Sequence, residues 1–280
     1  MKKTILILLC FSFFLSSCKP EKTGEENFTV VATFYPIYLL AINIADGVDG
    51  VSVQNLTAGN TGCPDEYQLT TAAAKTLSHA DLILSAGMGS ETFLDRIAAD
   101  KTVIDTSEGV TPMLCEDGEE NPHYWLSLSA VSAGVQTIAD ALAEADEKNA
   151  GIYRQNAEKF TQSLLDLENE FKTSFEEKNV RAASFHEAFS YFQRDFAFLI
   201  LESEHENLSP KNLSDIIRRM KEEEIPLIFA DRETLSSAEI VAAETGAVIC
   251  VLDPIENGAE GKDVYLSVMR TNLEKIRDAS

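Results

Sequence analysis

The fold is decided by the stretch AVSAGVQTIADAL at residues 130–142. Its apolar residues recur at positions i, i+3, i+4 and i+7, which lie on one face of an α-helix. The same spacing returns at Phe160, Leu164 and Phe171, and residues 128–178 contain almost no strand-forming run. One or two long amphipathic helices are therefore expected in the middle of the chain.

Short runs of β-branched residues alternate with helical patterns on both sides of this region. Strands are expected at Thr29–Thr33, Val51–Leu56, Asp81–Ser85 and Thr102–Asp105, and helices at Ile37–Ala45, Thr70–His79 and Ser90–Ala99. In the second half, strands are expected at Arg181–Phe185, Ala197–Glu202, Pro226–Ala230 and Ala247–Leu252, and helices at Glu187–Asp195, Pro210–Glu223, Ala238–Thr245 and Lys262–Arg277. Such alternation is typical of a parallel sheet covered by helices on both faces. The sequence therefore predicts an α/β protein with two lobes, each a parallel sheet flanked by helices, joined by a long rigid helix.

The first residues have the features of an export signal. Lys2 and Lys3 precede a mostly apolar run that ends at Leu15, which is shorter than the roughly 20 residues of a membrane-spanning helix. Small residues then lead to Cys18, an order that resembles a bacterial lipobox and implies cleavage after residue 17 and a lipid on Cys18. The alternative is an ordinary signal peptide that happens to contain a cysteine.

These features predict the organisation of the whole chain. We expect a lipoprotein signal peptide at 1–17, a tether at 18–27, a first lobe at 28–146, a connecting helix at 147–178 and a second lobe at 179–280. The protein would then lie outside the cytoplasm, anchored by its lipid to the bacterial cell membrane.

The chain is strongly acidic. With 46 acidic and 23 basic residues its formal charge is −23, and loss of Lys2 and Lys3 with the signal would make it −25. This charge argues against binding of nucleic acid or of anionic membranes by the folded body. It suits a surface that attracts cations, although a surplus of charge also serves solubility alone. The roughly 250 residues of the body can bury a large core, and we expect a monomer.

Three segments carry candidate metal ligands. His123 lies in NPHYWL at residues 121–126, between a helix-blocking proline and the only tryptophan. His186 follows the expected strand Arg181–Phe185 at its carboxyl end, where α/β sheets place ligands, and Asp253 follows the last expected strand. Imidazole and carboxylate groups are common ligands of transition metals. The competing interpretations are a capping or packing histidine and an ordinary Asp-Pro turn.

Four segments resemble, in the same order, the motifs of one family. They are VVATFYP at residues 30–36, NPHYWL at 121–126, SFHEAFSYF at 184–192 and LDP at 252–254. The family is that of the solute-binding proteins of metal-ion ABC transporters, which supply zinc or manganese to a membrane permease. The resemblance covers nearly all of the mature chain. It implies two α/β lobes bridged by a rigid helix, a metal ion held between the lobes and a permease as partner.

The resemblance also implies a ligand set, from which this chain departs at one position. The family usually has Pro-His-x-Tyr-Glu-Pro-Thr where this chain has PDEYQLT at residues 64–70, so that Asp65 stands at the place of the first histidine. Glu66 or Cys63 could fill that place instead. The implied ligands are therefore Asp65, His123, His186 and Asp253.

The choice of metal follows from two opposing clues. Oxygen ligands favour Mn²⁺, and this set has two carboxylates. His186 stands where manganese-type relatives often carry a glutamate, which favours Zn²⁺. We expect Zn²⁺ as the bound metal and Mn²⁺ as the second choice.

The cysteines and the remaining function classes complete the prediction. Cys63 and Cys115 each precede an expected ligand segment, so they could form a disulfide outside the cytosol, remain two thiols, or place the Cys63 thiolate on the metal. A metallohydrolase is disfavoured because the chain has no His-Glu-x-x-His, nucleophile elbow or phosphate-binding glycine loop. The other alternative is a surface adhesin with a degenerate metal site. The sequence predicts a binding protein that is not an enzyme.

Overall fold

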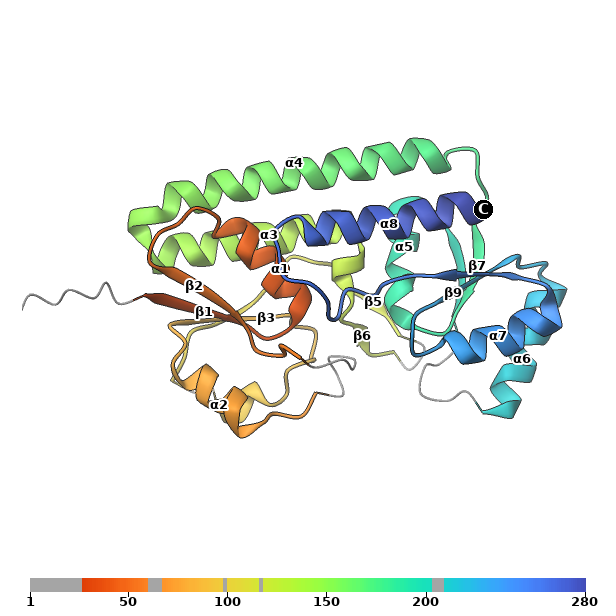
Figure 1. Ribbon diagram of the computed structural model, residues 1–280, viewed down its shortest axis with the longest axis horizontal. Coiled ribbons are helices and arrows are strands. Elements are labelled where there is room, and N and C mark those ends of the chain that lie inside the picture. The colour runs from red at the N-terminus through yellow and green to blue at the C-terminus, as the bar shows by residue number, and fades with distance from the viewer. Residues whose placement is uncertain (1–26, 60–66, 98–99, 116–117, 203–208) are drawn as a thin grey trace, which may run out of the picture.

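The computed structural model in Figure 1 describes residues 27–59, 67–97, 100–115, 118–202 and 209–280. Two four-stranded parallel sheets lie at opposite ends of an elongated molecule. The first contains β1 (Phe28–Ala32), β2 (Val51–Asn55), β3 (Leu82–Ser85) and β4 (Val103–Asp105) in the order β2-β1-β3-β4. The second contains β7 (Arg181–Ser184), β8 (Leu199–Glu202), β9 (Leu227–Ala230) and β10 (Val248–Val251) in the order β10-β9-β7-β8. Both sheets therefore have the same topology, with the second strand of each lobe at an edge.

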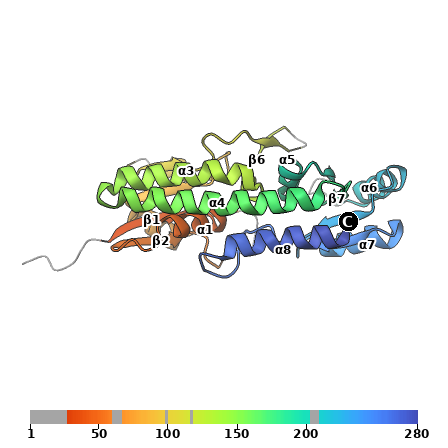
Figure 2. The same ribbon diagram turned by 90° about the horizontal axis from the view of Figure 1, so that it is seen from above.

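Helices cover both faces of each sheet. The first lobe has α1 (Tyr35–Ile44) and α2 (Thr71–Ser78), and the second has α5 (Phe192–Phe196), α6 (Pro210–Glu222) and α7 (Leu235–Thr245). The predicted helical region forms two helices, α3 (Leu128–Ala145) and α4 (Ala150–Phe175). Helix α4 runs along both lobes, and the last helix, α8 (Val264–Ala279), lies beside it in both views (Figures 1 and 2). The predicted two-lobe α/β fold with a long connecting helix is confirmed.

Side chains of the inner strands alternate between two cores, as expected for strands with helices on both faces. In β1, Val30 joins a large central core, whereas Val31 joins a smaller core with α2. In β9, Phe229 joins the central core, whereas Ile228 joins a smaller core with α6 and α7. The central core includes residues of both lobes and of α1, α3, α4 and α8. Because the lobes share one close-packed core, their connection is stiff.

The structure differs from the sequence-based prediction in three places. The helix predicted at Glu187–Asp195 begins as the 3₁₀ helix η5 (Glu187–Tyr191) and continues as the short α-helix α5. The helix predicted at Ser90–Ala99 is wrong for the part of it that the structure describes, which forms only a 3₁₀ turn, η2 (Leu94–Arg96). The antiparallel hairpin of β5 (Met113–Leu114) and β6 (Glu120–Asn121) has no counterpart in the prediction, because two-residue strands are too short to show a periodic pattern. No helix among the described residues is both long enough and apolar enough to cross a membrane.

The buried carboxylate of Glu91 explains why the segment after β3 turns instead of forming an α-helix. Glu91 accepts hydrogen bonds from the Thr33 hydroxyl at 2.6 Å and from the backbone N–H groups of Ala86 at 2.6 Å and Gly87 at 3.1 Å. These contacts hold the side chain beneath β1 and β3, and the backbone then continues with i to i+3 bonds such as that from Leu94 N to Glu91 O. Burial raises the pKa of Glu91 from 4.5 to about 7.

Glu91 is therefore expected to make stability depend on pH. A carboxyl whose pKa is higher in the folded chain than in the unfolded chain binds more protons when folded, so its contribution to stability is lost as pH rises between 4.5 and about 7. Each pKa unit corresponds to about 1.4 kcal/mol, so the unfolding free energy of the wild type should fall by roughly 3 kcal/mol relative to that of Glu91→Gln between pH ~4.5 and ~8. Urea titrations at several pH values measure this difference.

The matched control for this experiment is Glu158→Gln, because Glu158 is an exposed glutamate on α4. The control should follow the wild-type pH profile throughout. If Glu91→Gln also follows it, Glu91 does not titrate in this range.

Candidate metal centre

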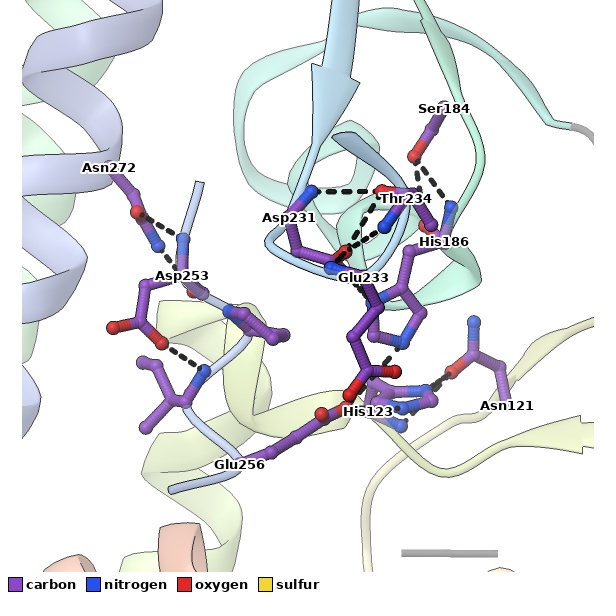
Figure 3. Close-up of polar contacts among 12 residues, drawn as sticks. Asn121, His123, Ser184, His186, Asp231, Glu233, Thr234, Asp253, Glu256 and Asn272 are labelled. Carbon is purple, nitrogen blue, oxygen red and sulfur yellow. Dashed lines mark hydrogen bonds and ion pairs between the residues drawn. The ribbon is translucent and has the colours of Figure 1, made fainter. Parts of the chain in front are cut away.

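Two imidazoles and one carboxylate come together between the lobes. His123 precedes the 3₁₀ turn η3 (Tyr124–Leu126), His186 follows β7, and Glu256 lies in the segment between β10 and α8. The Nε2 atoms of His123 and His186 each lie 3.5 Å from Glu256 Oε1. Their ligand atoms all lie within 4.8 Å of one another, and the three side chains are almost completely buried. Figure 3 shows the three groups pointing toward one another.

Asn121 fixes the orientation and the tautomer of His123. Its Oδ1 accepts the backbone N–H of His123 at 3.0 Å, which identifies this atom as the oxygen of the amide. The same oxygen lies 2.9 Å from Nδ1 of the imidazole, so Nδ1 carries a proton and Nε2 is the ring nitrogen directed at Glu256. The amide nitrogen of Asn121 donates to Glu187 O at 2.9 Å, next to His186 in the chain. One buried amide therefore holds both histidine segments.

Asp231 performs the same task for His186. Its Oδ2 lies 2.6 Å from Nδ1 of His186, and its Oδ1 accepts hydrogen bonds from Glu233 N and from the backbone N–H and hydroxyl of Thr234. Burial alone would raise the pKa of Asp231, but the hydrogen bond and the charge of His186, together with Thr234, hold it well below its ordinary value. Asp231 is thus an ionised acceptor for Nδ1–H of His186, and Nε2 of His186 is directed at Glu256.

Aromatic side chains complete the walls of the site. The Trp125 ring lies edge-on to His123, with 5.1 Å between the ring centroids, and Phe189 lies 5.6 Å from the His186 ring. The two imidazoles are themselves 5.1 Å apart and nearly perpendicular. Trp125 is fully buried and donates its indole N–H to Pro254 O at 2.9 Å. These contacts exclude water from the imidazoles and limit their motion.

This arrangement can bind a divalent metal ion. Transition metals bind imidazole nitrogen and carboxylate oxygen at about 2.0–2.2 Å, so ligand atoms a few ångströms apart can share one ion. Both Nδ1 atoms lie beside buried acceptors and both Nε2 atoms are directed at Glu256, which is the usual arrangement of metal-binding histidines. The donor set therefore fits a cation.

The structure brings together two of the four predicted ligands. His123 and His186 meet in the cluster, whereas Asp65 lies outside the described residues. Asp253 does not join the cluster: its Oδ1 accepts the backbone N–H of Ile255 at 2.8 Å, and its carboxylate points away from the imidazoles (Figure 3). Glu256, three residues later, lies with the two imidazoles in this cluster.

Sequence reasoning missed Glu256 and Asp231. Asp231 directly follows the buried strand β9, which is the same signal that points to Asp253 and could have identified it. Glu256 stands in a loop among other acids and carries no comparable signal. The lipidation site Cys18 and Cys63 also lie outside the described residues, so the lipid anchor and the Cys63–Cys115 disulfide stay predictions.

Comparison with known proteins finds relatives over almost the whole chain. The sequence model of the family described as "ZnuA: Zinc-uptake complex component A periplasmic" matches residues 30–279. The metal ABC transporter substrate-binding lipoprotein ScbA of Streptococcus cristatus is 28% identical, with 99% of each sequence covered. The manganese-binding lipoprotein MntA of Halalkalibacterium halodurans is 26% identical, with 95% of this chain and 96% of the relative covered. Among solved structures, a cadmium-bound periplasmic metal binding protein from Candidatus Liberibacter asiaticus superposes with a TM-score of 0.79 at 28% identity, over 89% of this chain and 98% of the other.

Proposed function

Since this chain belongs to the ZnuA family of zinc-uptake complex components, we propose that it is the solute-binding component of a metal-ion ABC importer. It captures a divalent metal ion between its lobes outside the cytoplasm and delivers the ion to a membrane permease. A lipid on Cys18 anchors it to the cell membrane. It binds and releases the ion without catalysing a reaction.

The observation that supports this proposal most directly is the pair of imidazoles at Glu256. Each has its Nδ1 fixed by a buried acceptor and its Nε2 turned to the same carboxylate oxygen, 3.5 Å away. A carrier site is closed by protein ligands, whereas a catalytic site keeps a position open for water or substrate. We propose His123, His186 and Glu256 as three ligands, and Asp65 remains the sequence-based proposal for the fourth.

We propose Zn²⁺ as the preferred metal and Mn²⁺ as the weaker one. For a given set of nitrogen and oxygen ligands, affinity for zinc exceeds affinity for manganese in the Irving–Williams order. Two imidazoles strengthen this preference, because nitrogen ligands suit zinc and all-oxygen sites suit manganese. Competition titrations with the two ions should therefore show tighter binding of Zn²⁺. Equal or stronger Mn²⁺ binding would assign the protein to manganese.

Metal binding should stabilise the protein measurably. At a free zinc concentration about 100 times the dissociation constant, binding adds about 2.7 kcal/mol to the unfolding free energy. For a chain of this size, that corresponds to a rise of roughly 5–10 °C in the melting temperature. Metal analysis of the same sample should find one ion per chain.

The variant His123→Ala is the control for this experiment. It should lose most of the zinc-dependent rise, because the imidazole supplies one of the ligands. If the wild type shows no rise with Zn²⁺ or Mn²⁺, the protein is not a carrier of either ion, and a surface protein with a degenerate site becomes the better assignment.

A further inference from the structure

The segment that carries Glu256 follows a strand of the second lobe but is bound to the first lobe. Residues 254–262, which we call the strap, connect β10 of the second lobe to α8. In Figure 1 the chain runs from β10 across to α1 of the first lobe before it returns along α8. Glu256 therefore follows a second-lobe strand in sequence, but its position depends on what holds the strap.

The strap makes a series of polar contacts with the first lobe. The Tyr35 hydroxyl on α1 donates to Ala259 O at 2.5 Å, and the Asn43 amide on the same helix donates to Lys262 O at 2.9 Å. The Lys262 ammonium lies 2.6 Å from Asp46, just beyond the end of α1. At the other end of the strap, the Trp125 indole donates to Pro254 O at 2.9 Å. These contacts tie the strap to the same lobe that carries His123.

The strap is also held in a strained backbone conformation beside the ligand. Ile255 has a φ of 59°, which is unfavourable for a β-branched residue, and its side chain is 1% exposed within the central core. Such a conformation persists only where the surroundings enforce it. Here burial of Ile255 and the hydrogen bonds of the strap enforce it, and Glu256 is directed toward the imidazoles as a result. A looser strap would let Ile255 relax and Glu256 turn away.

Tyr35 is the contact best placed to control this conformation. Its side chain is 4% exposed, and burial together with the nearby Asp253 raises the pKa of Tyr35 to about 12, so the hydroxyl keeps the proton that it donates. Gly258 approaches so closely that a Cβ at this position would lie 3.0 Å from the Tyr35 hydroxyl oxygen. Tyr35 thus contacts the strap at two successive residues, Gly258 and Ala259.

We propose that the strap holds Glu256 on the first lobe and that Tyr35 is the residue that positions it. Glu256 and His123 then form one half of the metal centre, and His186 is the ligand that the second lobe adds. This inference rests on the proposed function and differs from the sequence-based ligand set, which takes Asp65 and His123 from the first lobe and His186 and Asp253 from the second. Metal dissociation would begin with separation of His186, while Glu256 stays with His123.

Tyr35→Phe tests the positioning role, because it removes the hydroxyl and keeps the ring. In the full folded chain loaded with Zn²⁺, the rate of zinc transfer to an excess of chelator should rise about tenfold, as is typical when the partner of a ligand is lost. Tyr153→Phe is the matched control. Tyr153 is also buried, and its hydroxyl donates to Asp146 at the junction of α3 and α4, away from the strap. The control variant loses this hydrogen bond. The control should transfer zinc at the wild-type rate.

A double variant tests whether Tyr35 acts through Glu256. In a Glu256→Gln background, Tyr35→Phe should cause no further loss of zinc affinity, since the ligand that it positions is already removed. A zinc transfer rate of Tyr35→Phe equal to that of the wild type would overturn the inference, and so would a full tenfold loss of affinity in the Glu256→Gln background. Absence of zinc binding by the wild type itself would instead overturn the proposed function.

Discussion

Replacing Glu256 with glutamine is expected to weaken zinc binding by at least about a hundredfold. Loss of a residue that only orients a ligand typically costs roughly 10- to 100-fold in affinity, and loss of a charged ligand should cost no less. Glutamine keeps the size of the side chain, so the packing of the strap is preserved. Isothermal titration with Zn²⁺, after removal of bound metal by a chelator, measures the change.

Asp253→Asn provides the matched comparison for Glu256→Gln. The substituted amide would keep a carbonyl oxygen that accepts the backbone N–H of Ile255, so the strap should keep its conformation. We expect a zinc affinity within about threefold of that of the wild type. The substitution removes only a negative charge that does not contact the metal. If Asp253→Asn abolishes binding and Glu256→Gln does not, Asp253 is the ligand and the assignment of Glu256 is wrong.

The two imidazoles could be predicted because both lie where the backbone fixes them. His186 lies two residues after the end of β7, and His123 follows a proline at the start of a turn that is anchored by the buried Trp125. Such positions depend on local structure, which periodicity and proline placement reveal. The positive φ of Ile255 could not be predicted, because an isoleucine in that conformation is imposed by the central core and by contacts between distant segments. Ile255 lies between Asp253 and Glu256, so its conformation affects how these two carboxylates are directed.

The same distinction applies to the fold. The parallel strands could be predicted because most are short runs rich in β-branched or aliphatic residues, although their burial ranges from complete in β3 and β9 to partial in β2 and β4. The helix predicted at Ser90–Ala99 was wrong although its apolar spacing is compatible with a helix. The Glu91 carboxylate accepts hydrogen bonds from Thr33, which is distant in sequence, and from Ala86 and Gly87 in the preceding turn. Local propensity cannot register a tertiary contact of this kind.

Replacing Asp231 with asparagine is expected to weaken zinc binding about as severely as loss of a ligand, by roughly a hundredfold. The reason is the proton on His186. Three donors, Glu233 N and the backbone N–H and hydroxyl of Thr234, converge on Oδ1 of Asp231, so the single oxygen of an asparagine must stay on that side. Its NH₂ group would then face Nδ1 of His186 and donate to it. The imidazole would have to move its proton to Nε2, which removes the lone pair that faces the metal.

Asp231→Ala separates this tautomer effect from simple loss of a partner. Alanine leaves the three donors without their acceptor, so the metal-free protein should be less stable than Asp231→Asn. It places no donor at Nδ1, however, so His186 can still carry its proton there and offer Nε2, and zinc affinity should fall only about tenfold. The order of the two variants should therefore be opposite for stability and for affinity. If Asp231→Asn binds zinc more tightly than Asp231→Ala, Asp231 acts by packing alone. Nitrogen NMR of the His186 ring reports directly which atom is protonated, and in that case it should show the proton on Nδ1 in both variants.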